Sequence, residues 1–272
     1  MPAKKSSVSK DLGKLRICFD RVVTDAASPA RAEQERAALS HAHTMMSMSA
    51  TRGLDATEIG PIFRAALVDT KKWNNGRTLK CRFLDGSKTQ KKRVEAKAHL
   101  WEKYANIKFQ FVTTGNADIR ITFGFDAGSW SAVGTDALVE RYFPKHQPTM
   151  NYGWLEDDTD DEEYERVVVH EFGHAIGLIH EHQNPNAKLK WNKPVVYRVF
   201  SGSPNFWSKE DIDFNILERY SPKGISATSF DDKSIMLYQF DGALFLDNKP
   251  TPSNSRLSER DKSFIARMYP KP

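Results

Sequence analysis

The sequence predicts an α+β fold, in which strands and helices are mixed without regular alternation. Alternating apolar and polar residues indicate short strands between about residues 77 and 125, and helical spacing indicates helices near residues 91–105 and 160–180. After residue 185 the chain is rich in turn residues. Of the 272 residues, 39% are hydrophobic and 28% charged, which is typical of a globular protein with a sizeable core. No run of eighteen apolar residues occurs, so we expect no transmembrane helix.

The individual elements follow in chain order. LRICFDRVV has the pattern of a short strand, and the segment from Ser28 is typical of a helix. RTLKCRFLDG predicts a strand that ends in a turn, and KKRVEAKAHLWEKYA predicts an amphipathic helix. IKFQFV, ADIRITF and TMNYGWL indicate three further strands. The last helix begins at Ser258 and ends before Pro270. The predicted apolar side of the amphipathic helix consists of Val94, Ala98, Trp101 and Ala105.

Charge and cysteine content narrow the possible partners and compartments. The net charge is +5, and residues 71–93 contain nine basic residues and one acid. No nucleic-acid motif accompanies them, so we expect a solvated basic face and no nucleic-acid partner. Cys18 and Cys81 could form one bridge or remain two buried thiols. The amino terminus has no apolar signal region, which predicts a cytoplasmic protein, secretion by a signal-independent route, or a leader that has been removed.

Half of the eight histidines lie in the stretch RVVVHEFGHAIGLIHEHQNP, residues 166–185. On a helix, His170 and His174 lie about 40° apart on one face, beside an apolar stripe that faces the core. Two histidines at this spacing can bind one zinc ion. Glu171 lies between them in the chain, where it is placed to take a proton from a water molecule.

A catalytic zinc needs three protein ligands and one open position. His180 would face away from the other two histidines if the helix continued, but Gly177 can adopt the left-handed conformation that ends helices. A turn there would return His180 to the metal. His182 lies outside this pattern, and we expect it either behind the ligands or at the surface.

The resulting pattern, His170-Glu171-x-x-His174-x-x-Gly177-x-x-His180, resembles the extended zinc motif of the metzincin metallopeptidases. Downstream, Ser-Ile-Met-x-Tyr at residues 234–238 resembles the Met-turn of the astacin-like branch, and the glutamate at position 181 is also astacin-like. The resemblance covers about residues 70–272. It implies a zincin-like catalytic domain with a twisted mixed sheet, a cleft crossed by the zinc helix, and an irregular carboxy-terminal subdomain.

The resemblance also implies the division of the chain and the roles of its residues. Residues 1–68 would be an extension, either a pro-segment or a packing arm, 69–182 the subdomain with the zinc helix, and 183–272 the subdomain with the Met-turn. The implied function is a zinc-dependent endopeptidase, a monomer that acts on proteins or peptides and has no membrane partner. Its one catalytic Zn²⁺ would be bound by His170, His174 and His180. Glu171 would be the base, Met236 would lie beneath the metal, and Tyr238 would alternate between binding zinc and stabilising the transition state. An extended substrate would add a strand near GSWSAVG.

Some features depart from typical astacins. The two disulfides of typical astacins are missing, and Ser129 stands where the family often has cysteine, which indicates a divergent member. In the extension, Cys18 and Asp20 could reach the zinc as a latency switch, or the segment could be a strand packed on the domain. Two other functions stay open: a zinc-binding recognition protein without protease activity, and an intracellular metzincin-like protease that acts on DNA-bound proteins.

Overall fold

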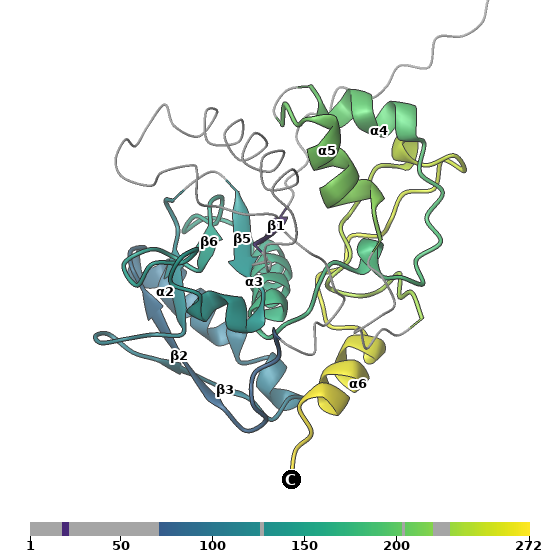
Figure 1. Cartoon of the computed structure of the whole chain (residues 1–272). Helices are drawn as coiled ribbons and strands as arrows, with labels where there is room; N and C mark the ends of the chain where they lie inside the picture. The colour runs from purple at the N-terminus through teal and green to yellow at the C-terminus, as the bar shows by residue number, and fades with distance from the viewer. Residues whose placement is uncertain (1–17, 22–70, 126–127, 203–204, 220–228) are drawn as a thin grey trace, which may run out of the picture.

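The computed structural model describes residues 18–21, 71–125, 128–202, 205–219 and 229–272 (Figure 1). Within these residues, six strands form one sheet in the order β1-β5-β6-β4-β2-β3. The strands are β1 (Cys18–Arg21), β2 (Thr78–Phe83), β3 (Lys108–Phe111), β4 (Ile119–Thr122), β5 (Ser129–Ala132) and β6 (Met150–Tyr152). β3, β2, β4 and β6 run parallel to one another, β5 is antiparallel to β6, and β1 is parallel to β5. This mixed sheet with its helices confirms the predicted α+β fold.

The alternating pattern of the sequence explains why β2 and β3 form strands. In β2, Leu79 and Cys81 are buried while Thr78 and Lys80 are exposed, so only one face of this strand contacts the core. β4, β5 and β6 are buried on both faces, which fits their position in the middle of the sheet or beneath other segments.

The amphipathic helix α2 (Lys88–Ala98) begins at Ser87, whose side chain forms a capping box with Gln90. The helix is shorter than the sequence predicted. It ends at Ala98, and Trp101 lies in a following 3₁₀ turn, η4 (Trp101–Lys103). Trp101 is nevertheless fully buried, and its indole Nε1 donates to the carbonyl of Val169, 2.9 Å away.

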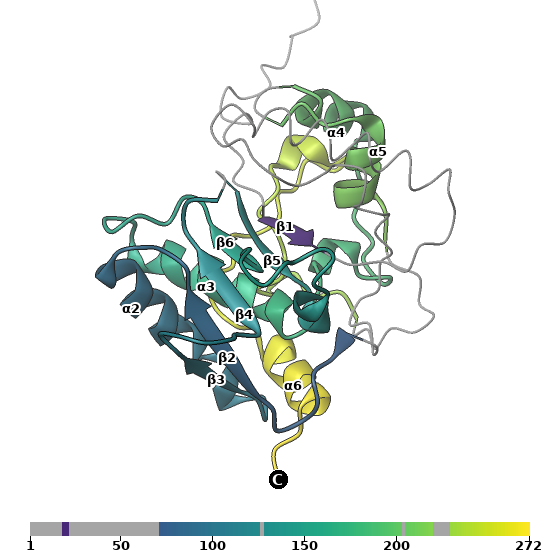
Figure 2. The same cartoon turned by 60° about the vertical axis from the view of Figure 1, so that its left-hand side comes forward.

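The histidine-bearing helix α3 (Asp161–Ala175) contacts α2 and β5 (Figures 1 and 2). Asp160 caps its amino terminus, and its acidic first turn suits the positive end of the helix dipole. At its other end, Trp73 Nε1 donates to Ala175 O at 2.8 Å and the Tyr269 hydroxyl donates to Ile176 O at 2.8 Å. Both ends of the domain therefore help to hold the end of this helix.

The carboxy-terminal part contains more helix than the sequence predicted. α4 (Lys193–Phe200), α5 (Lys209–Ile212) and the π-helical segment η7 (Asp213–Leu217) form a second apolar cluster with Tyr238, Phe240 and Phe245. The predicted last helix is present as α6 (Glu259–Met268), with its cap at Ser258. No helix among the described residues is long and apolar enough to cross a membrane.

The order of the strands in the sheet shows whether Cys18 and Cys81 can form a disulfide. Cys18 lies on β1 and Cys81 on β2, four strand positions apart. At about 4.8 Å per strand their backbones are roughly 19 Å apart, whereas a disulfide requires less than about 7 Å between Cα atoms. An intramolecular bridge is therefore incompatible with this fold, and Cys81 is a buried free thiol.

Candidate metal centre

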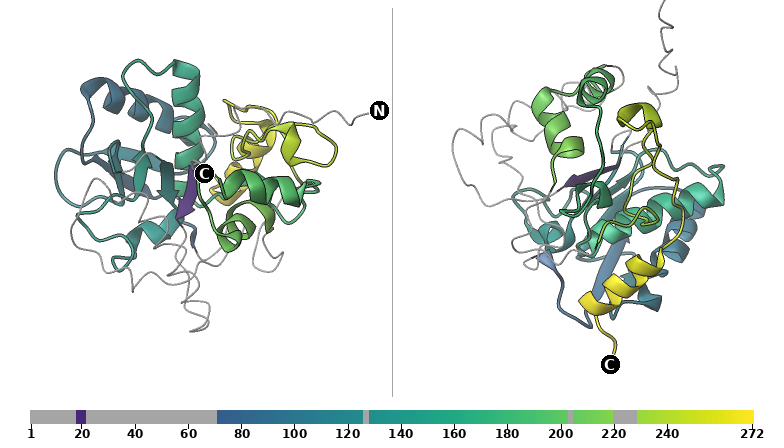
Figure 3. Two further views of the ribbon diagram at one scale, coloured as in Figure 1. Left: turned by 90° about the horizontal axis from the view of Figure 1, so that it is seen from above. Right: turned by 90° about the vertical axis from the view of Figure 1, so that its right-hand side faces the viewer.

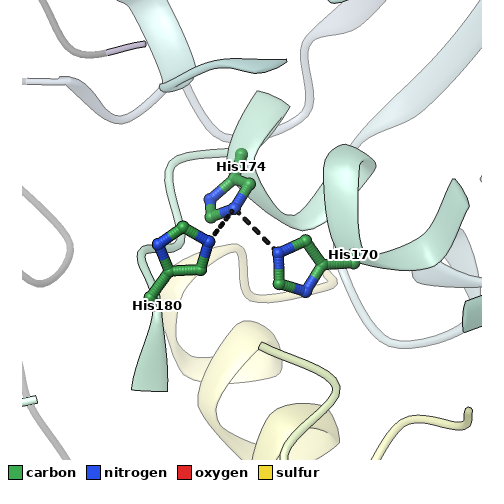
Figure 4. A group of neighbouring side chains, drawn as sticks. All are labelled: His170, His174 and His180. Atoms are coloured by element: carbon green, nitrogen blue, oxygen red, sulfur yellow. Dashed lines mark hydrogen bonds between the residues drawn. The ribbon is translucent and has the colours of Figure 1, made fainter. Parts of the chain in front are cut away.

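The last two turns of α3 bring two buried histidines together. His170 and His174 lie one turn apart on the same face, with their Nε2 atoms 3.1 Å from one another (Figure 4). Their rings are nearly perpendicular, at 86°, with centroids 4.7 Å apart. Such an arrangement lets both Nε2 atoms face one point between the rings.

The chain then turns sharply and brings in the third histidine. α3 ends at Ala175, and Gly177 has a φ of 101°, a left-handed conformation that favours glycine. Gly177 N donates to His174 O at 2.8 Å and Leu178 N to Gly173 O at 2.9 Å, so the last carbonyls of the helix are bonded. After this turn, His180 Nε2 lies 3.2 Å from His174 Nε2 (Figure 4).

Hydrogen bonds at the far side of the rings fix the tautomers of two histidines. His170 Nδ1 donates to Ile235 O and His174 Nδ1 donates to Leu178 O, each at 2.8 Å. The proton of each neutral ring is thus on Nδ1, and the Nε2 atoms present lone pairs. Burial, followed by the neighbouring His174 and His180, holds the pKa of His170 well below its ordinary value, so the neutral form is favoured.

These three nitrogen atoms fit a zinc ion. In a tetrahedral site with Zn–N bonds of about 2.0–2.1 Å, ligand nitrogens lie roughly 3.3 Å apart. The observed separations of 3.1 and 3.2 Å are close to this value. Lone pairs that face each other at this distance repel unless a cation lies between them. Among the described residues, His170, His174 and His180 form the group of three that could hold a metal ion.

Glu171 and Tyr238 lie next to this group. Glu171 follows His170 on α3 and is fully buried. Tyr238 is 5% exposed, and its ring centroid lies 4.2 Å from that of His180 and 5.6 Å from that of His170. The structure therefore places a buried glutamate next to His170 on the helix and a phenol ring beside the His170 and His180 rings.

The turn at residues 234–237 packs beneath the histidines. A Cβ added to Gly173 would lie 2.5 Å from Met236 Sδ, so the absence of a side chain at Gly173 lets Met236 approach α3. Ile235 O accepts from His170, and Met236 O accepts from Glu181 N at 2.9 Å. The carbonyl of Ile235 thus accepts a hydrogen bond from His170, and the next carbonyl, of Met236, accepts one from the residue that follows His180.

One residue that holds this turn in place was not among the residues predicted from the sequence. Asp261, in the first turn of α6, is buried and accepts from Ser234 Oγ at 2.7 Å and from Ile235 N and Ser258 N at 2.9 Å. The Ser-x-x-Asp spacing of a capping box was visible in the sequence, but it does not show that the aspartate also reaches a turn 26 residues away.

Glu181 lies behind the third histidine. Its Oε1 accepts from Asp231 N at 2.8 Å and from Asn184 Nδ2 at 2.9 Å. Burial is the main cause that raises the pKa of Glu181 to about 8, while the two hydrogen bonds act in the opposite direction.

The structure describes the backbone of the amino-terminal candidates Cys18 and Asp20, whereas their side chains lie outside the described part. Their strand, β1, pairs with β5, with Cys18 opposite Ser129 and Asp20 opposite Ser131. Figure 3 shows β1 at the boundary between the sheet and the carboxy-terminal segment. The alternative in which this segment packs on the domain as a strand therefore agrees with the fold.

Comparison with known proteins supports the same kind of site. The family model for Matrixin (Peptidase_M10) matches residues 72–194. One structure of myroilysin is 42% identical, with a TM-score of 0.73, and the match covers 76% of this chain and 100% of that chain. A second myroilysin structure is 39% identical, with a TM-score of 0.59 and coverage of 81% and 98%. High choriolytic enzyme 1, a hatching enzyme zinc-protease from Oryzias latipes, is 18% identical at a TM-score of 0.48, which is too low to add to the argument.

The similarity to myroilysin extends over the whole of that protein's structure at more than 40% identity. The mixed sheet, the matrixin match and the three converging imidazoles agree with it. This chain belongs to the metzincin-like zinc peptidases.

Proposed function

We propose that the protein is a zinc-dependent endopeptidase in which His170, His174 and His180 bind the metal and Glu171 is the base. The observation that carries this proposal is the convergence of three buried imidazoles at zinc-ligand spacing, on and after a helix that also carries the buried Glu171. A protein that only bound zinc for recognition would have no need of a base at this position.

The mechanism follows from the positions of these groups. His170, His174 and His180 would hold the zinc ion, which when bound would lower the pKa of a water molecule toward neutrality and polarise a carbonyl group. Glu171 takes the proton of the attacking water and delivers it to the leaving amine. Tyr238, whose ring lies against His180, donates its hydroxyl proton in a hydrogen bond to the developing oxyanion. Met236 supports the site from beneath α3 as the Met-turn residue.

The turn sequence and the glutamate after the third histidine support placement in the astacin-like branch. Ser234, Met236 and Tyr238 have the astacin-like order, and Glu181 follows His180 directly. The similarity to myroilysin shows the wider metzincin-like family, and the astacin-like branch is part of this proposal.

The substrate is proposed to bind along β5 as an added strand. In the structure that edge is occupied by β1, which runs parallel to β5 from Cys18 opposite Ser129 to Arg21 opposite Ala132. We therefore propose that the extension keeps the enzyme latent. The strand blocks the substrate edge, and the Cys18 thiolate or the Asp20 carboxylate is a candidate ligand for the metal.

Mass-spectrometric mapping of cleavage sites on a denatured proteome tests the endopeptidase proposal. Internal peptide bonds should be cut by the zinc-loaded protein, cleavage should stop with a chelator, and it should return when zinc is restored. A protein that binds one zinc ion per chain but cuts nothing, even after removal of the extension, would favour the recognition function. DNA-stimulated, salt-sensitive cleavage would favour the protease for DNA-bound proteins.

A further inference from the structure

The fourth histidine of the zinc segment, His182, is buried rather than at the surface. It lies in the 3₁₀ turn η6 (Glu181–Gln183), two residues after His180, and is 1% exposed. It does not belong to the group that could bind the metal. Its contacts therefore indicate another function for a buried polar ring at this position.

One side of His182 is bound to the carboxy-terminal helices. Its Nε2 donates to Asn215 O at 3.0 Å, and the neighbouring Gln183 Nε2 donates to Phe214 O at 2.8 Å. Both acceptors lie in η7, near the end of a helical segment, where main-chain carbonyls lack partners within the helix. Two side chains that follow the third zinc-ligand candidate thus bond the end of η7.

The ring of His182 also contacts the catalytic tyrosine candidate. Its centroid lies 5.1 Å from that of Tyr238, with 36° between the planes, and 5.3 Å from that of His180. Behind it, Phe240 packs edge-on at 5.1 Å and Trp191 at 6.4 Å. The bond to Asn215 fixes which nitrogen of His182 carries the proton and how the ring is oriented.

The backbone of Tyr238 is held separately from its ring. Thr251 Oγ1 donates to Tyr238 O at 2.6 Å and accepts from Phe240 N at 2.6 Å. The phenol ring, in contrast, is placed by the four rings packed around it, those of His170, His180, His182 and Phe240. Of these, His182 is the ring that also bonds to η7.

We infer that His182 is a positioning residue, which sets the place of the Tyr238 ring and couples it to the helical segment η7. This inference rests on the proposed role of Tyr238. A tyrosine that must reach a developing oxyanion needs its ring within a fraction of an ångström of the productive position. Loss of the His182 ring or of its bond to Asn215 leaves the Tyr238 ring with a wider range of orientations, so the loss appears in kcat rather than in substrate binding.

Kinetics of three variants test this inference in the proteolytically active form of the protein. His182→Phe keeps a ring but loses the donor to Asn215 O, and His182→Gln keeps an amide donor but loses the ring. Gln183→Met is the matched control, because it removes the parallel bond to Phe214 O from the same segment without touching Tyr238. We expect both His182 variants to lower kcat about tenfold with KM changed by less than about twofold, and Gln183→Met to match the wild type.

The double variant His182→Phe/Tyr238→Phe distinguishes a failure of this inference from a failure of the proposed role of Tyr238. If His182 acts through Tyr238, His182→Phe should cause no further loss of kcat in a Tyr238→Phe background. An equal loss in both backgrounds, or His182 variants that match Gln183→Met, would overturn the inference while the role of Tyr238 stands. Wild-type kcat in Tyr238→Phe alone would instead overturn the proposed role of Tyr238.

A measurement on the metal-free proteins gives a second readout that does not depend on turnover. The difference between the near-ultraviolet circular dichroism spectra of the wild type and Tyr238→Phe is the component that reports the surroundings of the Tyr238 ring. This component should be lost in His182→Phe and retained in Gln183→Met, with zinc affinity by chelator competition unchanged in both. Retention of the component in His182→Phe would contradict the inference, even if that variant unfolded more easily.

Discussion

At the scale of single residues, the environment of Glu181 shows how burial near the site changes the response to pH. Two hydrogen bonds reach its Oε1, yet burial raises the pKa to about 8 from an ordinary value of 4.5. Between these two values the folded protein binds more protons than the unfolded chain. The contribution of Glu181 to stability therefore falls as the pH rises through this window.

The replacement Glu181→Gln should remove this pH dependence of stability. Glutamine keeps an oxygen that accepts from Asp231 N and Asn184 Nδ2 but cannot ionise. In urea unfolding of the metal-free proteins, the stability of the variant relative to the wild type should increase between pH 5 and pH 8. Glu140→Gln, at an exposed glutamate, serves as the control. A difference between Glu181→Gln and the wild type that is the same at both pH values would show that Glu181 is already ionised.

The residues that sequence could predict are those whose spacing alone brings them together. His170 and His174 share a helix face by periodicity, and Gly177 permits the turn that returns His180. The role of Asp261 could not be predicted, because its contact with the 234–237 turn depends on the path of the chain between α6 and that turn. The sequence left open whether His182 lies behind the ligands or at the surface, because its neighbours Asn215 and Trp191 are distant in the sequence.

At the scale of elements, the packing of α3 on the 234–237 turn depends on Gly173. An added Cβ would lie 2.5 Å from Met236 Sδ and 3.2 Å from a ring atom of Trp101. Met236 would have to move, and with it the turn whose Ile235 carbonyl holds His170.

Gly173→Ala should therefore weaken both the fold and the metal site. We expect a loss of about 1–3 kcal/mol in the free energy of unfolding, as is usual for an overpacked core, together with lower zinc affinity. Urea unfolding and chelator competition measure the two effects. Gly124→Ala is the control, because nothing lies within 4 Å of an added Cβ there. A Gly173→Ala protein with wild-type stability and zinc affinity would show that Met236 does not support the site.

Prediction from sequence was most successful for elements with strong periodicity. The strands with alternating burial and the zinc helix appear where their patterns indicate. α4, α5 and η7 were missed because each is short and turn residues separate α4 from the other two, so no long apolar period marks them. They form through contacts with Phe240 and Phe245, which a local pattern does not contain.

At the scale of the whole molecule, the sheet order places β1 beside β5, at the edge proposed for the substrate. Local sequence patterns could suggest both strands but could not show that they pair, because more than one hundred residues separate them in the chain. The proposed latency is a consequence of this pairing.

Removal of residues 1–60 should raise the specific activity on casein, because it frees the edge of β5. In the full chain, Cys18→Ser and Asp20→Asn are compared separately to identify which side chain binds the metal. Activation by the deletion but by neither substitution would mean that the strand blocks the site on its own. An unchanged or lower activity after the deletion would contradict latency.

The proposed mechanism requires that the three histidines bind zinc and that Glu171 acts on the water. Zinc content and casein cleavage measured on the same preparation of Glu171→Ala, with the extension removed, test it most directly. We predict one zinc ion per chain, as in the wild type, and a loss of peptide cleavage by at least about 100-fold, since a general base commonly contributes 10²–10⁴-fold. Cleavage by this variant at the wild-type rate would contradict the assignment of Glu171 and with it the proposed mechanism.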